Sequence, residues 1–297
     1  MELVRKPTVA GMFYHSKKEA LIEEIEHCFL DPPGPGKSSE PDDTGGRLFG
    51  VIVPHAGYSC SGAIAAHSYK AIMDAGFADV FIIIGPNHHG IGSDVALSPH
   101  DSWQTPLGKT SVDVILKKAL VGGRITLNET AYRYQENSVE VQLPFLQYCG
   151  RDHVFSISPI VMAMQDYETS VEVGKHLAKV IRNEKRKICI IASTDFSHEG
   201  FAYGHMPPKG FSVDEFVRKQ DAFVIDHIVN MDSKRMIKAI NENHISMCGY
   251  GPVIVLLTAA EIIQGKSVEL LKYGTSYDMY PDSNACVGYG AFALYEA

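Results

Sequence analysis

The chain alternates between continuous apolar runs and segments whose apolar residues repeat at helical spacing. Such runs are typical of strands that are buried on both faces of a sheet. Four of them stand out: LFGVIV from Leu48, VFIII from Val80, SISPIVM from Ser156 and KICIIAS from Lys187. Helical spacing between these runs predicts an α/β fold with a mixed, mostly parallel central sheet and helices on both faces.

The N-terminal part of the chain is expected to form a helix over residues 16–30. Ser16 and Glu19 have the spacing of a capping box, and apolar residues recur behind them at helical intervals. Residues 31–46 are dominated by Pro, Gly, Ser and Asp, which predicts a surface loop. Too little chain precedes this loop to build a separate core, so we expect a single three-layer domain over residues 1–297.

The first two apolar runs flank a helix expected over residues 61–75, with Gly76 as its stop. This order is a strand-helix-strand unit, whose strands lie parallel and are joined by a right-handed crossover. The segments that follow the two strands, PHAGY and GPNHH, therefore meet at one edge of the sheet. The unit brings His55 and His88 together.

The second half of the chain continues the alternation. Asn137 and Glu140 have capping-box spacing before a helix that runs to Cys149, with Pro144 as an expected kink or early break. Further helices are expected over residues 167–182, 213–229, 233–243 and 252–264, and further strands over residues 268–274 and 285–295.

Composition narrows the class of protein. The 297 residues are 45% hydrophobic and 21% charged, which is typical of a globular domain. A net charge of −8 argues against nucleic acid as a partner. The longest apolar run, residues 252–263, is too short to span a bilayer, and the N-terminus lacks the apolar core of a secretory signal, so we expect no membrane association and a cytoplasmic location. The six cysteines contain no CxxC pair and are interpreted as free thiols.

Three of the expected strand ends carry histidine. His55 follows the first strand, His88 and His89 follow the second, and Asp195 with His198 follows the KICIIAS run. Ligands of open α/β sheets bind at the carboxyl ends of the strands, so these residues predict a shared site. Imidazole is a common ligand of iron, copper and zinc, and two histidines with one anionic ligand leave open positions on a metal ion.

Cys248 is a candidate for the third ligand. It precedes Gly249, Gly251 and Pro252, a flexible segment that opens into a helix. A helix N-terminus lowers the pKa of a thiol and favours the thiolate that metals bind. An inert buried cysteine explains the same residue equally well.

Five motifs resemble those of the Memo family: PHAGYSCSG, GPNHHG, ENSVEVQLP, STDFSH and CGYGP. They occur in the family's order, and the resemblance runs from AGMFY near residue 11 to GYGAFALY at the end of the chain. It implies a fold like that of the class III extradiol dioxygenases, with a metal on His55, His88 and Cys248. His198 then resembles the acid/base residue of those enzymes, and Asp195 is placed to orient it or to bind substrate.

Four more residues are candidates for substrate binding. Tyr58 lies where the chain turns into a helix whose free N–H groups can receive an anion, although N-capping by a serine explains that segment too. His89 is expected to face away from the metal, because neighbours in an extended segment point to opposite sides. Glu140 reaches the pocket or serves the capping box with Asn137. His205, seven residues beyond His198, is a further candidate contact.

The resemblance and the residues leave three functions open. The first is a mononuclear iron or copper enzyme of redox or dioxygenase-like type that acts on a small molecule. The second is a non-catalytic metal- or peptide-binding signalling protein with a protein partner, and the third is a zinc-dependent hydrolase. In the dioxygenases the third ligand is a carboxylate, whereas this chain offers the soft thiolate of Cys248, which suits copper or thiolate-tolerant iron or zinc. We expect iron or copper rather than zinc. The substrate, the reaction and the oligomeric state are not encoded in any motif.

Overall fold

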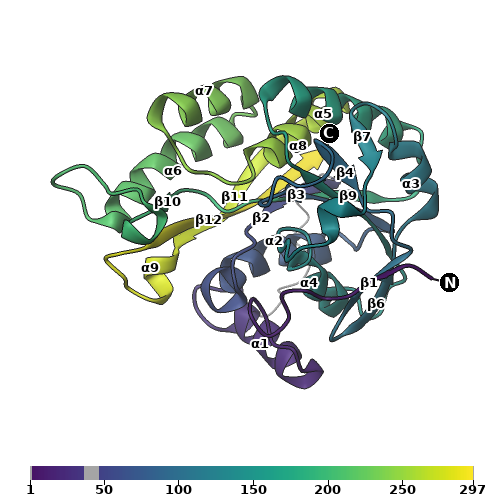
Figure 1. Ribbon diagram of the computed structural model, residues 1–297, viewed down its shortest axis with the longest axis horizontal. Helices are drawn as coiled ribbons and strands as arrows, with labels where there is room; N and C mark the ends of the chain where they lie inside the picture. The colour runs from purple at the N-terminus through teal and green to yellow at the C-terminus, as the bar shows by residue number, and fades with distance from the viewer. Residues whose placement is uncertain (1, 37–46, 297) are drawn as a thin grey trace.

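The computed structural model describes residues 2–36 and 47–296 (Figure 1). Its central sheet has nine strands within these residues. In spatial order they are β10 (His198–Glu199), β12 (Cys286–Glu296), β2 (Leu48–Val53), β9 (Ile188–Ser193), β3 (Val80–Pro86), β8 (Ser156–Met162), β4 (Val95–Leu97) and β7 (Ile125–Leu127), with β11 (Gly265–Thr275) paired to β12.

The middle of this sheet is parallel and its flanks are mixed. Strands β2, β9, β3 and β8 are neighbours in that order and all run in the same direction. β12 is antiparallel to β2, β10 and β11, and β4 is antiparallel to β8. The predicted α/β fold with a mixed, mostly parallel central sheet is confirmed. The carboxyl ends of the parallel strands share one edge, as the crossover rule requires.

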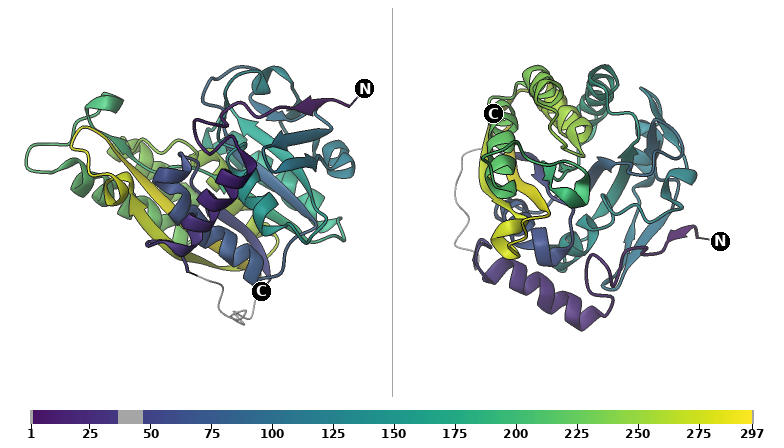
Figure 2. Two further views of the ribbon diagram at one scale, coloured as in Figure 1. Left: turned by 90° about the horizontal axis from the view of Figure 1, so that it is seen from below. Right: turned by 60° about the vertical axis from the view of Figure 1, so that its left-hand side comes forward.

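Helices cover both faces of the sheet (Figures 1 and 2). One face carries α1 (Lys18–Leu30), α2 (Ala63–Asp74) and α4 (Gln142–Cys149), and the other carries α3 (Val114–Leu120), α5 (Tyr167–Arg182), α6 (Val213–Val229), α7 (Ser233–Asn243) and α8 (Tyr250–Ile262). Strand β3 shows why its sequence is a continuous apolar run. Its Ile82 and Ile84 enter one core, while Phe81 and Ile83 enter the other.

A second, smaller sheet lies at the N-terminus and was not predicted. It joins β1 (Val4–Arg5) to β5 (Ser102–Thr105) in parallel, and β5 to β6 (Gly108–Ser111) as a hairpin. A short helix α9 (Ser276–Met279) lies between β11 and β12. The two-residue strand β1 carries too few residues for an alternating pattern to be recognised in the sequence.

Both predicted capping boxes are wrong. Helix α1 begins at Lys18 and has Lys17 at its N-cap in place of Ser16, and α4 begins at Gln142 with Val141 at its N-cap. The side chains that were expected to cap α4 bind more distant parts of the chain, as described below. Pro144 lies in the first turn of α4, where a missing backbone N–H costs nothing, so it neither kinks nor breaks the helix.

Three other expectations concern the surface loop, the single domain and the absence of a membrane span. Of the surface loop predicted over residues 31–46, positions 37–46 lie outside the described residues. That residues 1–297 form a single domain stays a prediction. None of the helices in residues 2–36 and 47–296 combines the length and the apolar character of a bilayer span.

Candidate metal centre

Three neighbouring strands deliver the histidines and an aspartate to one edge of the sheet. β2 ends at Val53 just before His55, β3 ends at Pro86 just before His88, and β9, which lies between them, ends just before Asp195. The hydrophobic runs hold the strands in the core, and the polar residues begin where the strands end. His55 and Asp195 are buried there, whereas the His88 side chain is 35% exposed. This is the arrangement that the strand-end pattern predicted.

Cys248 reaches the same edge from the segment before α8. One ligand atom from each of His55, His88 and Cys248 lies within 4.8 Å of the other two. The Cys248 Sγ atom is 3.2 Å from His55 Nε2. Nitrogen and sulfur ligands lie about 2.0–2.3 Å from an ion such as zinc, so ligands of one ion are within about 4.6 Å of each other. Cys248 and His55 lie within this limit, and the 4.8 Å spread of all three atoms is close to it, so the three side chains form a candidate site for one metal ion.

The hydrogen bonds of His55 define which of its nitrogens is free. The Ser193 hydroxyl donates to the carbonyl of Ser138 (2.5 Å), so it accepts from His55 Nδ1, which is 2.9 Å away. Gln142 donates a further hydrogen bond to the same hydroxyl. His55 Nδ1 then carries the proton, and its Nε2 presents a lone pair beside the Cys248 sulfur.

A buried glutamate orients His88 in the same manner. Glu136 accepts hydrogen bonds from His88 Nδ1 (3.0 Å), from the His88 backbone N–H (2.7 Å) and from the Ser138 backbone N–H (2.9 Å). Burial alone would raise the pKa of the Glu136 carboxyl, but His88 and the Ser138 hydrogen bonds outweigh it and lower the pKa to about 2. A carboxylate that holds the Nδ1–H of a histidine is a recurrent partner in metal sites, where it frees Nε2 for the ion.

Glu136 was missed in the sequence. Its segment, ENSVEVQLP, contains two glutamates, and capping-box spacing pointed to Glu140. No local pattern distinguishes a glutamate that meets His88 from one that meets another part of the fold.

The prediction that the pKa of the Cys248 thiol is lowered is wrong. Burial raises this pKa, and the negative charge of Asp195 raises it further. Although α8 begins at Tyr250, its N-terminus does not compensate for this desolvation. The Asp195 backbone N–H donates to the sulfur over 3.3 Å. A cation between the thiol and the two imidazoles would supply the charge that stabilises a thiolate here.

Asp195 and His198 lie beside the cluster, each with its own partners. Asp195 Oδ1 accepts from the His55 backbone N–H (2.7 Å), and its Oδ2 is 4.0 Å from His55 Nε2. Burial raises the pKa of Asp195. His198 Nδ1 lies 3.1 Å from the carbonyl of Ser246, so Ser246 orients this ring and Asp195 positions the His55 backbone. Catalytic roles for Asp195 and His198 stay predictions.

Tyr58, one of the candidate substrate contacts, faces another part of the fold. The Tyr58 hydroxyl donates to the carbonyl of Val141 (2.6 Å), and its ring packs against Phe145 of α4 at a centroid distance of 4.7 Å. The amide of Asn137, the expected capping partner of Glu140, donates to the carbonyl of His55.

Glu140 is committed to the N-terminal segment. It forms an ion pair with Arg5, accepts from the backbone N–H groups of Thr8 and Val9, and accepts from the Tyr14 hydroxyl. The Glu140 side chain is 1% exposed. These contacts tie β1 and the following loop to the start of α4 and give the residue a structural role.

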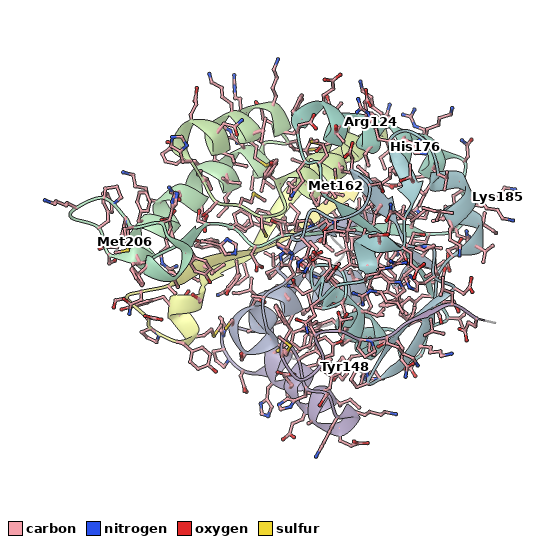
Figure 3. All side chains as sticks on the ribbon, in the orientation of Figure 1. Arg124, Tyr148, Met162, His176, Lys185 and Met206 are labelled. Atoms are coloured by element: carbon pink, nitrogen blue, oxygen red, sulfur yellow. The ribbon has the colours of Figure 1, made fainter. Side chains whose placement is uncertain are left out.

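His89 and His205 lie at the surface. The His89 ring packs 5.9 Å from the ring of Tyr134, and His205 Nδ1 lies 3.5 Å from a carboxylate oxygen of Glu199. His205 precedes Met206, which marks the loop that projects after β10 (Figure 3). Contacts of either histidine with substrate stay predictions.

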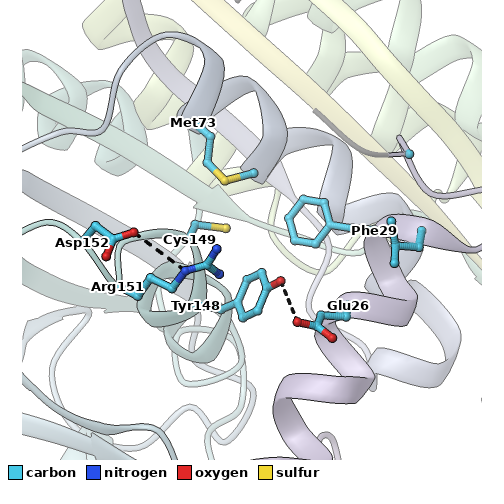
Figure 4. Close-up of a pocket in the computed structure, with 9 residues that line it drawn as sticks. Glu26, Phe29, Met73, Tyr148, Cys149, Arg151 and Asp152 are labelled. Carbon is cyan, nitrogen blue, oxygen red and sulfur yellow. Dashed lines mark hydrogen bonds and ion pairs between the residues drawn. The ribbon is translucent and has the colours of Figure 1, made fainter. Parts of the chain in front are cut away.

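A separate pocket of about 460 Å³ lies near α1, α2 and α4, away from these ligands (Figure 4). Its walls include Phe29, Met73 and Tyr148, and its rim includes Glu26 and Arg151. None of the metal-centre residues lines it, so it has no part in the argument about the metal.

Comparison with known proteins identifies the family of this chain. The family model described as "Memo-like protein" matches residues 5–293. The chain belongs to the Memo family. It is 43% identical to a MEMO1 family protein of Methanococcoides burtonii and 40% identical to one of Methanococcus vannielii. Each match covers 98% of this chain and 100% of the relative.

A solved structure resembles this Memo-family chain in fold. An uncharacterized protein of Escherichia coli K12 superposes with a TM-score of 0.53 at 13% identity, over 82% of this chain and 99% of that protein. At this identity the likeness concerns the fold alone. The resemblance to the Memo family that the sequence motifs indicated is confirmed.

Proposed function

We propose that this protein binds one iron or copper ion through His55, His88 and Cys248 and uses it in a redox or dioxygenase-like reaction on a small molecule. The observation that carries the proposal is the convergence of the three ligand atoms within 4.8 Å. Two of these ligands are already oriented, because Ser193 and Glu136 hold the Nδ1 atoms of the histidines. Such prior orientation is what metal sites require of their surroundings.

The donor set is compatible with a redox metal. A thiolate is a soft ligand that suits copper, iron and zinc, and three protein ligands leave positions for a substrate. When bound, such an ion would bind and polarise a substrate oxygen and exchange electrons with it. The centre is accessible from the side of His88, whose side chain is 35% exposed, so a small molecule can approach.

His198 is proposed to move a proton. Its Nδ1 faces the carbonyl of Ser246 at 3.1 Å and therefore carries hydrogen, which leaves Nε2 as a base. Neighbouring Asp195 keeps the backbone of His55 in place. The proposed fold likeness to class III extradiol dioxygenases supports the same division between metal ligands and a proton-transfer residue, with a cysteine here in place of their carboxylate ligand.

The test is the metal content of protein purified without oxygen or chelators. We expect about one ion per chain in the wild type and a loss of at least ten-fold in occupancy for Cys248→Ser. Cys149→Ser is the matched control, because Cys149 lies in the separate pocket of Figure 4 and should leave metal binding unchanged.

The outcomes separate the candidate functions. Absence of metal from wild-type protein, also after incubation with iron, copper or zinc salts, would refute the metal centre and favour a metal-free binding protein. Zinc alone, without redox activity, would favour a hydrolase on the same ligands. Retention of metal in Cys248→Ser would remove the cysteine from the ligand set.

A further inference from the structure

Strand β12 passes directly beside the segment that follows β9. The backbone N–H of Phe196 donates to the carbonyl of Gly288 (2.8 Å), and the N–H of Gly288 donates to the carbonyl of Ser197 (2.9 Å). Tyr289 is therefore the next residue along a strand bonded to residues 195–198, which carry both predicted catalytic side chains.

The alternation of β12 decides which way Tyr289 points. A Cβ atom added at Gly288 would overlap the carboxylate of Asp221, so that position faces α6. Tyr289 points to the opposite face. There it belongs to an apolar cluster that includes Ala56, the residue that immediately follows His55. The ring of Tyr289 thus packs beside the residue that follows His55.

The hydroxyl of Tyr289 differs from those of the other buried tyrosines. The remaining buried tyrosines of residues 2–36 and 47–296 all donate hydrogen bonds, and they are Tyr14, Tyr58, Tyr69 and Tyr132. Tyr289 is 2% exposed, yet its hydroxyl bonds to no described residue. Buried phenol groups usually have a hydrogen-bond partner. The described residues supply none for Tyr289, so its hydroxyl is available to a bound molecule.

This hydroxyl borders accessible space. Within the described ranges, the fully enclosed polar atoms that lack a partner belong to Arg5, Ser158, Ser197, Glu199 and Gln220. The Tyr289 oxygen is not one of them, so the small exposed part of the residue includes its hydroxyl. A molecule that enters this space can accept a hydrogen bond from it.

The surroundings keep this hydroxyl protonated. Burial raises the pKa of Tyr289, and the negative charge of Asp195 raises it further. Tyr203, whose ring contacts His198 edge-on at 5.3 Å, also has its pKa raised by burial and by Asp195. Both phenols therefore stay hydrogen-bond donors at neutral pH.

We propose that Tyr289 contacts the substrate, and that its hydroxyl donates a hydrogen bond to an anionic oxygen of a small molecule held at the metal centre. A cation on His55, His88 and Cys248 attracts an anion, and a phenol donor selects one with an acceptor atom beyond the metal-bound atom. Carboxylates and enolates have this chemistry. The inference rests on the proposed metal centre and adds the class of ligand.

Azide binding to cobalt-loaded protein tests it, because azide is a small anion with accepting terminal atoms and perturbs the visible spectrum of cobalt. We expect Tyr289→Phe to keep its cobalt and to bind azide about ten-fold or more weakly, as loss of a hydrogen bond to a charged group implies. Tyr280→Phe is the matched control, since Tyr280 is 62% exposed and should match the wild type.

The outcomes distinguish this inference from the metal centre itself. Full cobalt occupancy with unchanged azide affinity in Tyr289→Phe would overturn the role of Tyr289 and leave the metal centre intact. Failure of the wild type to hold cobalt would overturn both. A measurement on zinc-loaded wild type guards against misfolding of the variant: the ¹³Cζ resonance of Tyr289 should shift on addition of azide, and a fixed resonance would overturn the inference.

Discussion

Replacement of Glu136 by glutamine tests whether the hydrogen-bond partner of His88, a proposed metal ligand, controls metal binding. Glu136 is 2% exposed and receives three N–H donors, two from His88 and one from Ser138. Glutamine has nearly the same shape but offers one accepting oxygen and an NH₂ group. In Glu136→Gln at least one N–H of this cluster therefore faces another donor, and the negative charge that polarises the imidazole is lost.

The expected magnitude follows from the position of Glu136. Loss of a hydrogen-bond partner of a metal ligand typically weakens metal affinity by about 10–100-fold, which is about 1.4–2.7 kcal/mol. Because Glu136 holds both the ring and the backbone of His88, we expect the upper part of this range.

The contribution of Glu136 to the free energy of unfolding should fall as the pH is lowered. The pKa of Glu136 is lowered from 4.5 to about 2, so the carboxylate contributes stability above about pH 4.5 and loses it as the pH falls toward 2. The difference in unfolding free energy between wild type and Glu136→Gln should reach at most about 3 kcal/mol at neutral pH and shrink below pH 4.

A competition titration of metal-free protein with cobalt and a chromophoric chelator at pH 7 measures the affinity. Glu140→Gln is the matched control, because Glu140 belongs to the same segment but pairs with Arg5. It should lower stability and leave the cobalt affinity within about two-fold of the wild type. Wild-type affinity in Glu136→Gln would show that Glu136 does not prepare His88 for metal, and the ligand role of His88 would then lose its main structural support.

Two further predictions concern buried charges outside the metal centre. Burial raises the pKa of Asp221 from 3.8 to about 6, so the protein loses stability as the pH rises from about 4 through 6 and this carboxyl ionises. Asp221→Asn should therefore be more stable than wild type by about 2–3 kcal/mol at pH 8 and equal to it below pH 4. Denaturant unfolding that shows the same gain at both pH values would contradict this. Arg5→Met leaves the Glu140 carboxylate buried without its cation and should cost about 3–5 kcal/mol in urea unfolding at pH 7, whereas a cost below about 1 kcal/mol would mean that the other donors to Glu140 suffice.

The hydrophobic pattern predicted the parallel middle of the central sheet and the position of the two histidines, but not the short strands β4, β7 and β10. A strand buried on both faces must be a continuous apolar run, and a crossover between parallel strands places their carboxyl ends at one edge. His55 and His88 follow such runs directly, so their proximity could be predicted. The family resemblance then added Cys248, whose approach to the centre no local pattern encodes.

Tertiary packing decided which hydrogen-bond and ion-pair partners these residues have. Glu136 and Glu140 are four residues apart in one segment, yet one orients His88 and the other neutralises Arg5. Local spacing predicted a capping box for Glu140. This spacing carries no information about Arg5, which is far away in sequence. Contacts of this kind are fixed by which surfaces meet in the folded core, not by neighbours along the chain.

The protonation of Cys248 also depends on the tertiary structure, because burial removes water from its thiol. The helix that follows Cys248 predicted a lowered thiol pKa, but burial in the folded protein raises it, since removal of water penalises the charged form. The free hydroxyl of Tyr289 likewise exists only because β12 crosses beside the segment after β9. The sequence by itself determined which residues stand at the sheet edge, and only the tertiary structure decided which are charged, oriented or free to bind, because burial and long-range hydrogen bonds arise when the layers pack.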